Sequence, residues 1–133
     1  MKSQWIIGLI ILGSSYSYAA SFDCSKAKSP IEKSICADPK LSVLDDKLAD
    51  TYSNIKNNLS EVAKSKLRNH QTAWLKSLAQ DCSDVISSKD NKKIANCLIN
   101  YYESRIQYLI SLNPPVDGFY KFPTLGKTAN ISY

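Results

Sequence analysis

Residues 29–59 have the sequence SPIEKSICADPKLSVLDDKLADTYSNIKNNL, which contains two helix starts and a regular apolar pattern. Ser29 is a preferred N-cap residue, and Pro30 stands at the first helical position, where no amide hydrogen is needed. Glu32, at the third helical position, is placed to bond back to the cap. The pattern predicts a short helix that ends near Ala37.

A second helix is expected over residues 39–58, because Asp38 and Pro39 repeat the same start and apolar residues follow at spacings of three and four. The two asparagines at 57–58 are weak helix formers, and Ser60 is suited to cap a new helix, so a bend is expected there. The apolar stripe consists of Leu41, Leu44, Leu48, Tyr52, Ile55 and Leu59.

Two further helices follow, one after Ser60 and one starting near Asp90, while the polar segment 83–91 is expected to be a loop. The first of them carries Ala63, Leu67, Gln71, Trp74, Leu78 and Cys82 on one face, and the second Ile94, Leu98, Tyr101, Arg105, Tyr108 and Leu112. Short connections make neighbouring helices antiparallel. The sequence therefore predicts an all-α, small up-and-down bundle of three long helices and one short N-terminal helix, over residues 20–112.

Glycine is absent from the 133-residue chain between Ser14 and Asp117. Phosphate-binding loops, dinucleotide fingerprints and tight hairpin turns each need a backbone conformation that glycine supplies cheaply. The body of the chain is therefore expected to hold no nucleotide cofactor and no hairpin sheet.

The first 19 residues have the features of a signal peptide: Lys2, the apolar run Trp5–Leu12, and small residues before a cleavage point after Ala19. Ser17 and Ala19 then occupy positions −3 and −1. The apolar run is far shorter than the roughly 20 residues that span a bilayer, so no transmembrane segment is expected after cleavage. We expect a periplasmic or secreted protein.

Four cysteines remain after cleavage, an even number in an oxidising compartment, which predicts two disulfides. Three connectivities are possible. We favour Cys24–Cys36 and Cys82–Cys97, because each closes a short local segment whose ends the helix pattern brings together. Spacings of 12 and 15 do not resemble the close cysteine pairs of zinc sites, so no metal is expected.

The charged and nucleophilic residues do not form a catalytic set. His70 is the single histidine and has no nucleophile beside it in sequence. Asp45 and Asp46 are adjacent, which on a helix points them about 100° apart, so they cannot flank one glycosidic bond. The mature chain has 16 basic and 12 acidic residues, a net charge of +4 without the clustering of a nucleic-acid footprint. We expect a binding protein that is not an enzyme.

Arg105 is the most unusual residue of the apolar stripes, because a guanidinium placed there must reach solvent or find a carboxylate. Asp45, on the inward face of the second helix, is the expected partner. Asp45 and Arg105 are also candidates for partner binding, as are Tyr52 and Trp74. A structural role inside the bundle is the alternative for Arg105 and Trp74.

The segment 113–133 combines Pro114, Pro115 and Pro123 with two glycines, so an extended tail is expected. Its aromatic residues are Phe119, Tyr120 and Phe122. They could pack on the bundle as a strap or form a recognition segment for a partner.

Two cysteine pairs and a Cys-Ala-Asp-Pro turn at 36–39 carry a family resemblance. The matching residues are Phe22-Asp23-Cys24, Ile31 to Pro39, Leu41, Leu44, Asp45, Leu48 and Tyr52, then Leu67, Gln71, Trp74, Cys82, Cys97, Arg105, Ile106 and Leu109. In these positions the chain resembles the LprI-like lysozyme-inhibitor family of small exported bacterial domains. It departs at Leu78, where similar proteins often carry arginine four residues after the tryptophan.

The resemblance implies inhibition of lysozyme, outside the inner membrane, by a helical domain with two disulfides. A mature charge of +4 gives no long-range attraction to basic lysozymes, so a local acidic or aromatic patch must supply the affinity. Asp45, Asp46 and Asp50 are candidates for it. The leading hypothesis is occlusion of a peptidoglycan-cleaving enzyme; the alternative is an envelope scaffold domain that binds glycan or another protein through the aromatic tail.

Overall fold

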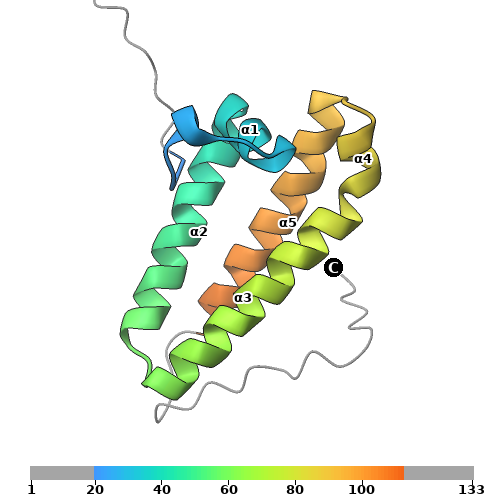
Figure 1. Cartoon of the computed structure of the whole chain (residues 1–133). Helices are drawn as coiled ribbons and strands as arrows, with labels where there is room; N and C mark the ends of the chain where they lie inside the picture. The colour runs from blue at the N-terminus through green and yellow to red at the C-terminus, as the bar shows by residue number, and fades with distance from the viewer. Residues whose placement is uncertain (1–19, 113–133) are drawn as a thin grey trace, which may run out of the picture.

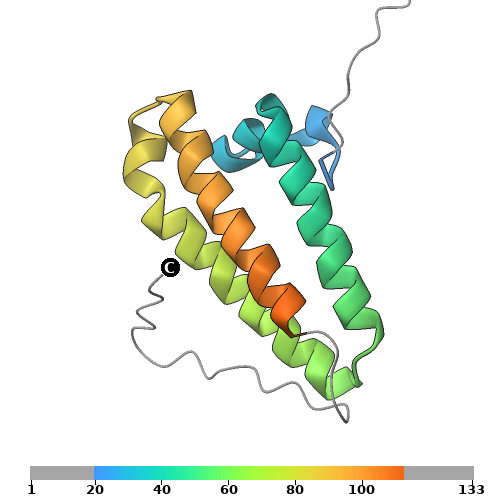
Figure 2. The same ribbon diagram turned by 180° about the vertical axis from the view of Figure 1, so that it is seen from behind.

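The computed structural model describes residues 20–112, so the predicted signal peptide and the predicted tail, with Phe119, Tyr120 and Phe122, lie outside the described residues. The described part is helical and contains no strand, which confirms the predicted fold class (Figures 1 and 2). In chain order the elements are a 3₁₀ turn η1 (Cys24–Lys26), α1 (Pro30–Ala37), α2 (Pro39–Asn57), α3 (Glu61–Asp81), α4 (Ser83–Ser87) and α5 (Asn91–Ser111).

The first three α-helices begin where their capping residues predict. At α1 the capping box is complete, since the Glu32 amide donates to Ser29 Oγ at 3.1 Å and Glu32 Oε2 accepts from the Ser29 amide at 2.9 Å. Asp38 Oδ1 accepts from the amide of Leu41 at 2.9 Å at the start of α2. Ser60 caps α3 in the same way.

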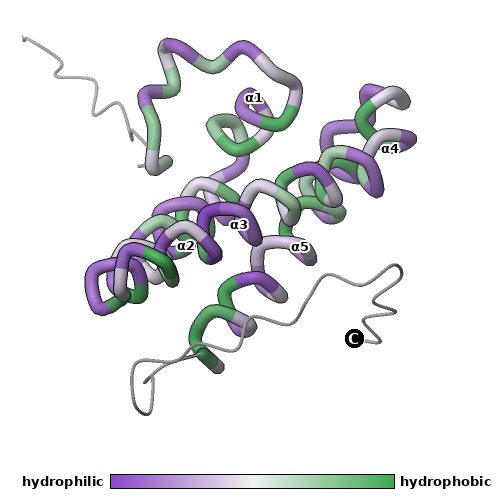
Figure 3. Tube along the Cα trace, turned by 60° about the horizontal axis from the view of Figure 1, so that its bottom comes forward, coloured by the Kyte–Doolittle hydropathy of each residue, from purple (hydrophilic) through white to green (hydrophobic). Residues whose placement is uncertain are grey.

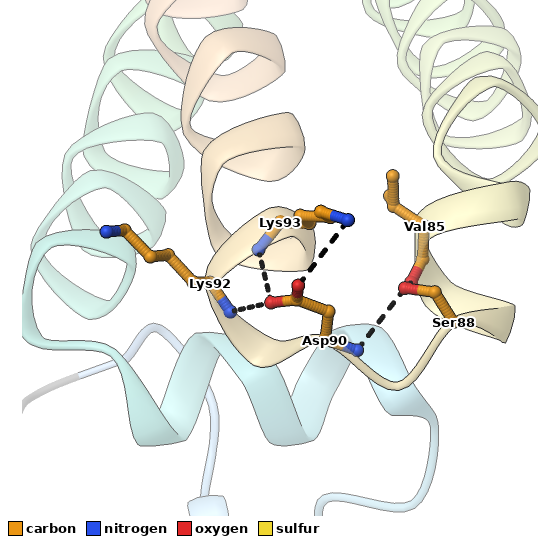
Figure 4. Close-up of polar contacts among 5 residues, drawn as sticks. All are labelled: Val85, Ser88, Asp90, Lys92 and Lys93. Carbon is orange, nitrogen blue, oxygen red and sulfur yellow. Dashed lines mark hydrogen bonds and ion pairs between the residues drawn. The ribbon is translucent and has the colours of Figure 1, made fainter.

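The start of α5 is fixed by Asp90, as predicted (Figure 4). One carboxylate oxygen, Oδ1, accepts from the amides of Lys92 and Lys93 at 3.1 and 3.2 Å. The Asp90 amide donates to Ser88 Oγ, whose hydroxyl in turn donates to the carbonyl of Val85. These bonds satisfy amides that have no partner within the helix and tie its first turn to the preceding one.

The prediction of a loop over 83–91 is wrong in its first half, where Ser83–Ser87 form α4. The segment is polar in composition, but Val85 and Ile86 are half-buried and pack against the core. Two apolar residues in five are too few to give a periodic signal, so packing rather than pattern defines this helix. The turn to α5 places Lys89 at a φ of 57°, a left-handed conformation for which glycine is the usual choice.

The three long helices form the bundle, and α1 lies across the end where α2 begins (Figure 1). The closest backbone packing is between α2 and α5, while α3 stands farther from both. Hydrophilic and hydrophobic residues are interspersed along each long helix (Figure 3), and buried apolar side chains pack together in the core. The fully buried side chains include Leu41, Leu67, Leu78, Leu98, Ile106 and Leu109.

Both predicted disulfides are present, which confirms the pairing. Cys24 joins Cys36 with a Cα–Cα distance of 5.8 Å, and thereby ties η1 to α1. Cys82 joins Cys97 at 6.1 Å, and links the end of α3 to α5. Within residues 20–112, no helix is long and apolar enough to cross a membrane, and no group of three or more His, Cys, Asp or Glu side chains is arranged to hold a metal ion.

Candidate functional site

A cleft of about 240 Å³ lies between α2 and α3, and we call it the α2–α3 cleft. Three of the predicted partner-binding residues, Asp45, Tyr52 and Trp74, meet there although α2 and α3 are separate elements. The complete lining is Ser21, Asp45, Leu48, Ala49, Tyr52, Ser53, Gln71, Trp74, Leu75 and Tyr102. Because α3 lies farther from α2 and α5 than these two helices lie from each other, a recess with aromatic walls remains beside α3.

Asp45 is buried, with 7% of its surface exposed, and is held by three donors. The Tyr102 hydroxyl donates to Oδ1 at 2.8 Å, and the amide of Ser21 donates to Oδ2 at 2.9 Å. The Ser21 hydroxyl also donates to Oδ2. Burial, together with the neighbouring Asp45 carboxylate, raises the pKa of Tyr102, so this hydroxyl keeps its proton and remains a donor.

The predicted ion pair between Asp45 and Arg105 is wrong. Arg105 is 3% exposed, and its guanidinium donates from Nε and Nη2 to Oε1 of Gln71 at 2.9 and 2.7 Å. Its Nη1 lies 2.7 Å from Nδ1 of His70. Asp45 and Arg105 do lie on the inward faces of their helices. Helical spacing predicts in which direction a side chain points, but it does not predict at which height along the bundle axis the side chain lies. At the height of Asp45, α5 presents Tyr102, one turn before Arg105.

Two aromatic rings lie close to the Arg105 guanidinium. Its Cζ lies 5.7 Å from the ring centroid of Trp74 and 5.2 Å from that of Tyr108, within the range of cation–π attraction. Trp74 also meets the Tyr102 ring edge-on at 5.5 Å, so the same indole borders the cleft and covers the arginine. Arg105 thus supports the wall of the cleft from behind.

The protonation states in this cluster follow from burial. Desolvation lowers the pKa of Arg105 to about 10, so the guanidinium remains charged at neutral pH. Desolvation, with the charge of Arg105, lowers the pKa of His70 and keeps its imidazole neutral. Because Nδ1 faces a donor, we assign the remaining proton to Nε2. The His70 ring stacks on Tyr108 at 5.2 Å, and burial raises the pKa of that tyrosine.

A family model described as "Lysozyme inhibitor LprI" matches residues 24–109, which include both disulfides and every described helix except the last two residues of α5. The chain belongs to the LprI lysozyme inhibitor family. Searches of curated proteins and of solved structures found no match. Membership and the two disulfides indicate a protein that works outside the cytoplasm. The family is named for inhibition, which is a binding role.

The geometry of this LprI-family chain adds four residues that the sequence analysis did not assign to the site. Gln71 and His70 hold Arg105, while Tyr102 and Ser21 hold Asp45. The contact of Gln71 could have been predicted from the sequence, because Gln71 is a polar residue in the apolar stripe of α3, just as Arg105 is a polar residue in the apolar stripe of α5. The contact of Ser21 could not have been predicted, since Ser21 and Asp45 are 24 positions apart in the sequence.

A second depression, of about 630 Å³, lies between α2 and α5 and is lined by Leu44, Lys47, Glu103, Ser104, Ile106 and Gln107. It is larger than the α2–α3 cleft, but none of the side chains that line it is aromatic. The exposed ion pair of Lys40 and Glu103 lies at its side, at 2.8 Å. We take the α2–α3 cleft as the candidate site, because it combines aromatic surfaces with buried, hydrogen-bonded polar groups.

Proposed function

We propose that the mature protein is a non-catalytic inhibitor that binds lysozyme, or a related peptidoglycan-cleaving enzyme, and occludes it with the surface around the α2–α3 cleft. The observation that carries this proposal is the meeting of Asp45, Tyr52 and Trp74 in one cleft. We further propose that the protein acts in the periplasm or after secretion, following cleavage after Ala19.

The rim of the cleft has the composition of a protein-binding surface. Leu75 of α3 is 49% exposed at the edge, next to the half-buried Trp74. An exposed apolar side chain beside an aromatic anchor is typical of interaction surfaces. On the α2 side, Asp46 and Asp50 are exposed, and each follows a residue that lines the cleft. They offer local negative charge on a chain whose total charge gives no attraction to a basic enzyme.

The chemistry of the cleft supports binding rather than catalysis. The carboxylate of Asp45 is occupied by three donors, and the imidazole of His70 is engaged by Arg105. A general base must reach a proton of the substrate or of a nucleophile. Asp45 and His70 are the titratable groups best placed for such a role, but both instead form hydrogen bonds that stabilise the fold.

The decisive experiment compares Leu75→Arg with Ile110→Arg in a lysozyme inhibition assay. Both side chains are apolar and similarly exposed, at 49% and 44%, but only Leu75 lines the cleft. We expect Leu75→Arg to weaken inhibition about tenfold or more, which corresponds to about 1.4 kcal/mol of binding energy. Ile110→Arg should inhibit like the unaltered protein. Equal inhibition by both variants would remove the cleft from the contact surface.

The target is best found by testing the oxidised mature chain against lysozymes of several types, in pull-down and wall-lysis assays. Binding and slowed lysis are expected with at least one type. If no type is bound or inhibited, the proposal fails and the envelope scaffold alternative takes its place. That alternative depends on Phe119, Tyr120 and Phe122, outside the described residues.

A further inference from the structure

The Asp45 carboxylate is a buried negative charge with no cation beside it in the described part of the chain. Its three partners are the amide and hydroxyl of Ser21 and the hydroxyl of Tyr102, and all three are neutral. The ion pairs found among residues 20–112 are Lys40–Glu103, Lys64–Glu61 and Lys93–Asp90. A buried charge without a counter-ion is costly, so a cation near Asp45 would stabilise the fold.

The backbone next to Asp45 is the segment that export would turn into a chain terminus. Ser21 becomes the second residue if the signal is removed after Ala19, and Ala20 is then the first. Ala20 is half-buried and packs against the core. Covalent bond lengths place the Ala20 nitrogen no more than about 4.3 Å from the Ser21 nitrogen. The Ser21 nitrogen lies 2.9 Å from Asp45 Oδ2, so the Ala20 nitrogen lies within about 7 Å of the carboxylate.

We propose that processing after Ala19 supplies the missing charge: the α-ammonium group of Ala20 is the counter-ion of Asp45, and the new terminus completes the Ser21 end of the α2–α3 cleft. Hydrolysis of the Ala19–Ala20 peptide bond consumes one water molecule, leaves a carboxylate on Ala19 and leaves an amine on Ala20. At neutral pH the amine takes a proton. Before cleavage the same nitrogen is a neutral amide, so the precursor lacks this charge.

Three groups in or behind the cleft, Tyr102, Arg105 and His70, have pKa values outside the range where an α-amino group titrates, about pH 7 to 9. Tyr102 lines the cleft, and its pKa is raised by burial and by Asp45. Tyr52 also lines the cleft. Behind Trp74, the pKa of Arg105 is about 10 and that of His70 lies below its ordinary 6.5. A charge change between pH 7 and 9 in the cleft therefore reports on the terminus.

The test measures the pKa of the α-amino group by NMR in a mature chain that begins at Ala20, after reductive ¹³C-methylation of its amines. The reference is the same labelled chain unfolded in urea. We expect the folded chain to show a pKa about one unit higher, a tenfold higher proton affinity, because the carboxylate favours the charged amine. Asp45→Asn should abolish this difference. Asp46→Asn is the matched control, since Asp46 is adjacent and exposed, and should retain it.

A second variant keeps the inference testable if Asp45→Asn does not fold. A chain that begins at Ala19 carries its amine one residue farther from Asp45, so we expect a smaller pKa difference and a lower Tm. Mass spectrometry of the exported protein should find Ala20 as the first residue. A terminus elsewhere, or an α-amino pKa equal to that of the unfolded chain, would overturn the proposal. The inference rests on the proposed processing after Ala19, but lysozyme inhibition is not measured in these experiments, so its failure is distinguishable from failure of the proposed inhibitor role.

Discussion

The hydroxyl groups of Tyr102 and Tyr108 are both buried on α5, but they differ in their partners. Tyr102 donates to Asp45 at 2.8 Å, whereas Tyr108 Oη has no hydrogen-bond partner within the described residues. We expect Tyr102→Phe to lower the free energy of unfolding by about 2 kcal/mol, because a buried carboxylate loses a donor. Tyr108→Phe removes an unsatisfied hydroxyl, so its stability should be unchanged or higher by up to about 1 kcal/mol.

Urea unfolding of the two variants checks this prediction, and each serves as the control for the other. Both changes remove one oxygen atom from a tyrosine and leave the ring in place. Equal losses would mean that the loss of a hydroxyl, and not the loss of a bond to Asp45, determines the effect.

His70 makes the stability sensitive to acid. Burial and the charge of Arg105 lower the pKa of His70 in the folded protein, while the unfolded chain has the ordinary value near 6.5. As the pH falls through 6.5, His70 binds a proton in the unfolded chain but not in the folded protein. The free energy of unfolding therefore falls until the folded pKa is reached. Above pH 7 the residue has no effect.

We expect the Tm to fall between pH 7.5 and 5.5 in the unaltered protein, and to fall less in His70→Asn. Asparagine keeps an oxygen acceptor near the position of Nδ1 for the Arg105 donor and has no proton to take up. Parallel pH profiles for the two proteins would show that His70 is not the acid-sensitive group.

At the scale of elements, the local rules predicted α1, α2, α3 and α5 because the determinants lie within a few residues of one another. Ser29, Asp38, Ser60 and Asp90 each cap the helix that follows. The same rules missed α4, whose Val85 and Ile86 gain their stability from the core. They also could not place Arg105 against Gln71, since helical spacing gives the direction of a side chain and not its height in the bundle.

The two disulfides should differ in how much stability they contribute. Cys82 is fully buried in the core and the bond to Cys97 holds the corner around α4, whereas Cys24 is exposed in η1. Closing a segment of 15 residues stabilises by about 3 kcal/mol through the unfolded chain. We expect replacement of both Cys82 and Cys97 by alanine to cost at least that much. Replacement of both Cys24 and Cys36 should cost less.

Denaturant unfolding gives the two free energies, and hydrogen exchange locates the damage. Amides of α4 should exchange faster without the Cys82–Cys97 bond and be unchanged without the Cys24–Cys36 bond. An equal loss of stability in the two variants would contradict the unequal roles that burial assigns to the two bonds.

For the whole molecule, the sequence predicted the fold class more completely than the site. Asp45, Tyr52 and Trp74 were identified by type and helical face, and the structure brings them to one cleft. The arrangement around them depends on how far α3 stands from α2 and α5, which is set by the packing of Trp74, Tyr102 and Arg105. Such packing between distant segments leaves no pattern in any one of them.

Removal of the segment 113–133 distinguishes the cleft from the aromatic tail as the contact surface. All the described helices, both disulfides and the α2–α3 cleft lie within residues 20–112. A chain of residues 20–112 should therefore keep its helical circular dichroism signal and cooperative unfolding. If the cleft is the contact, inhibition of lysozyme should persist in this shortened chain and be lost when Leu75→Arg is added. Loss of inhibition on truncation, with the helical signal unchanged, would assign recognition to Phe119, Tyr120 and Phe122, because the framework would be intact and the contact would not.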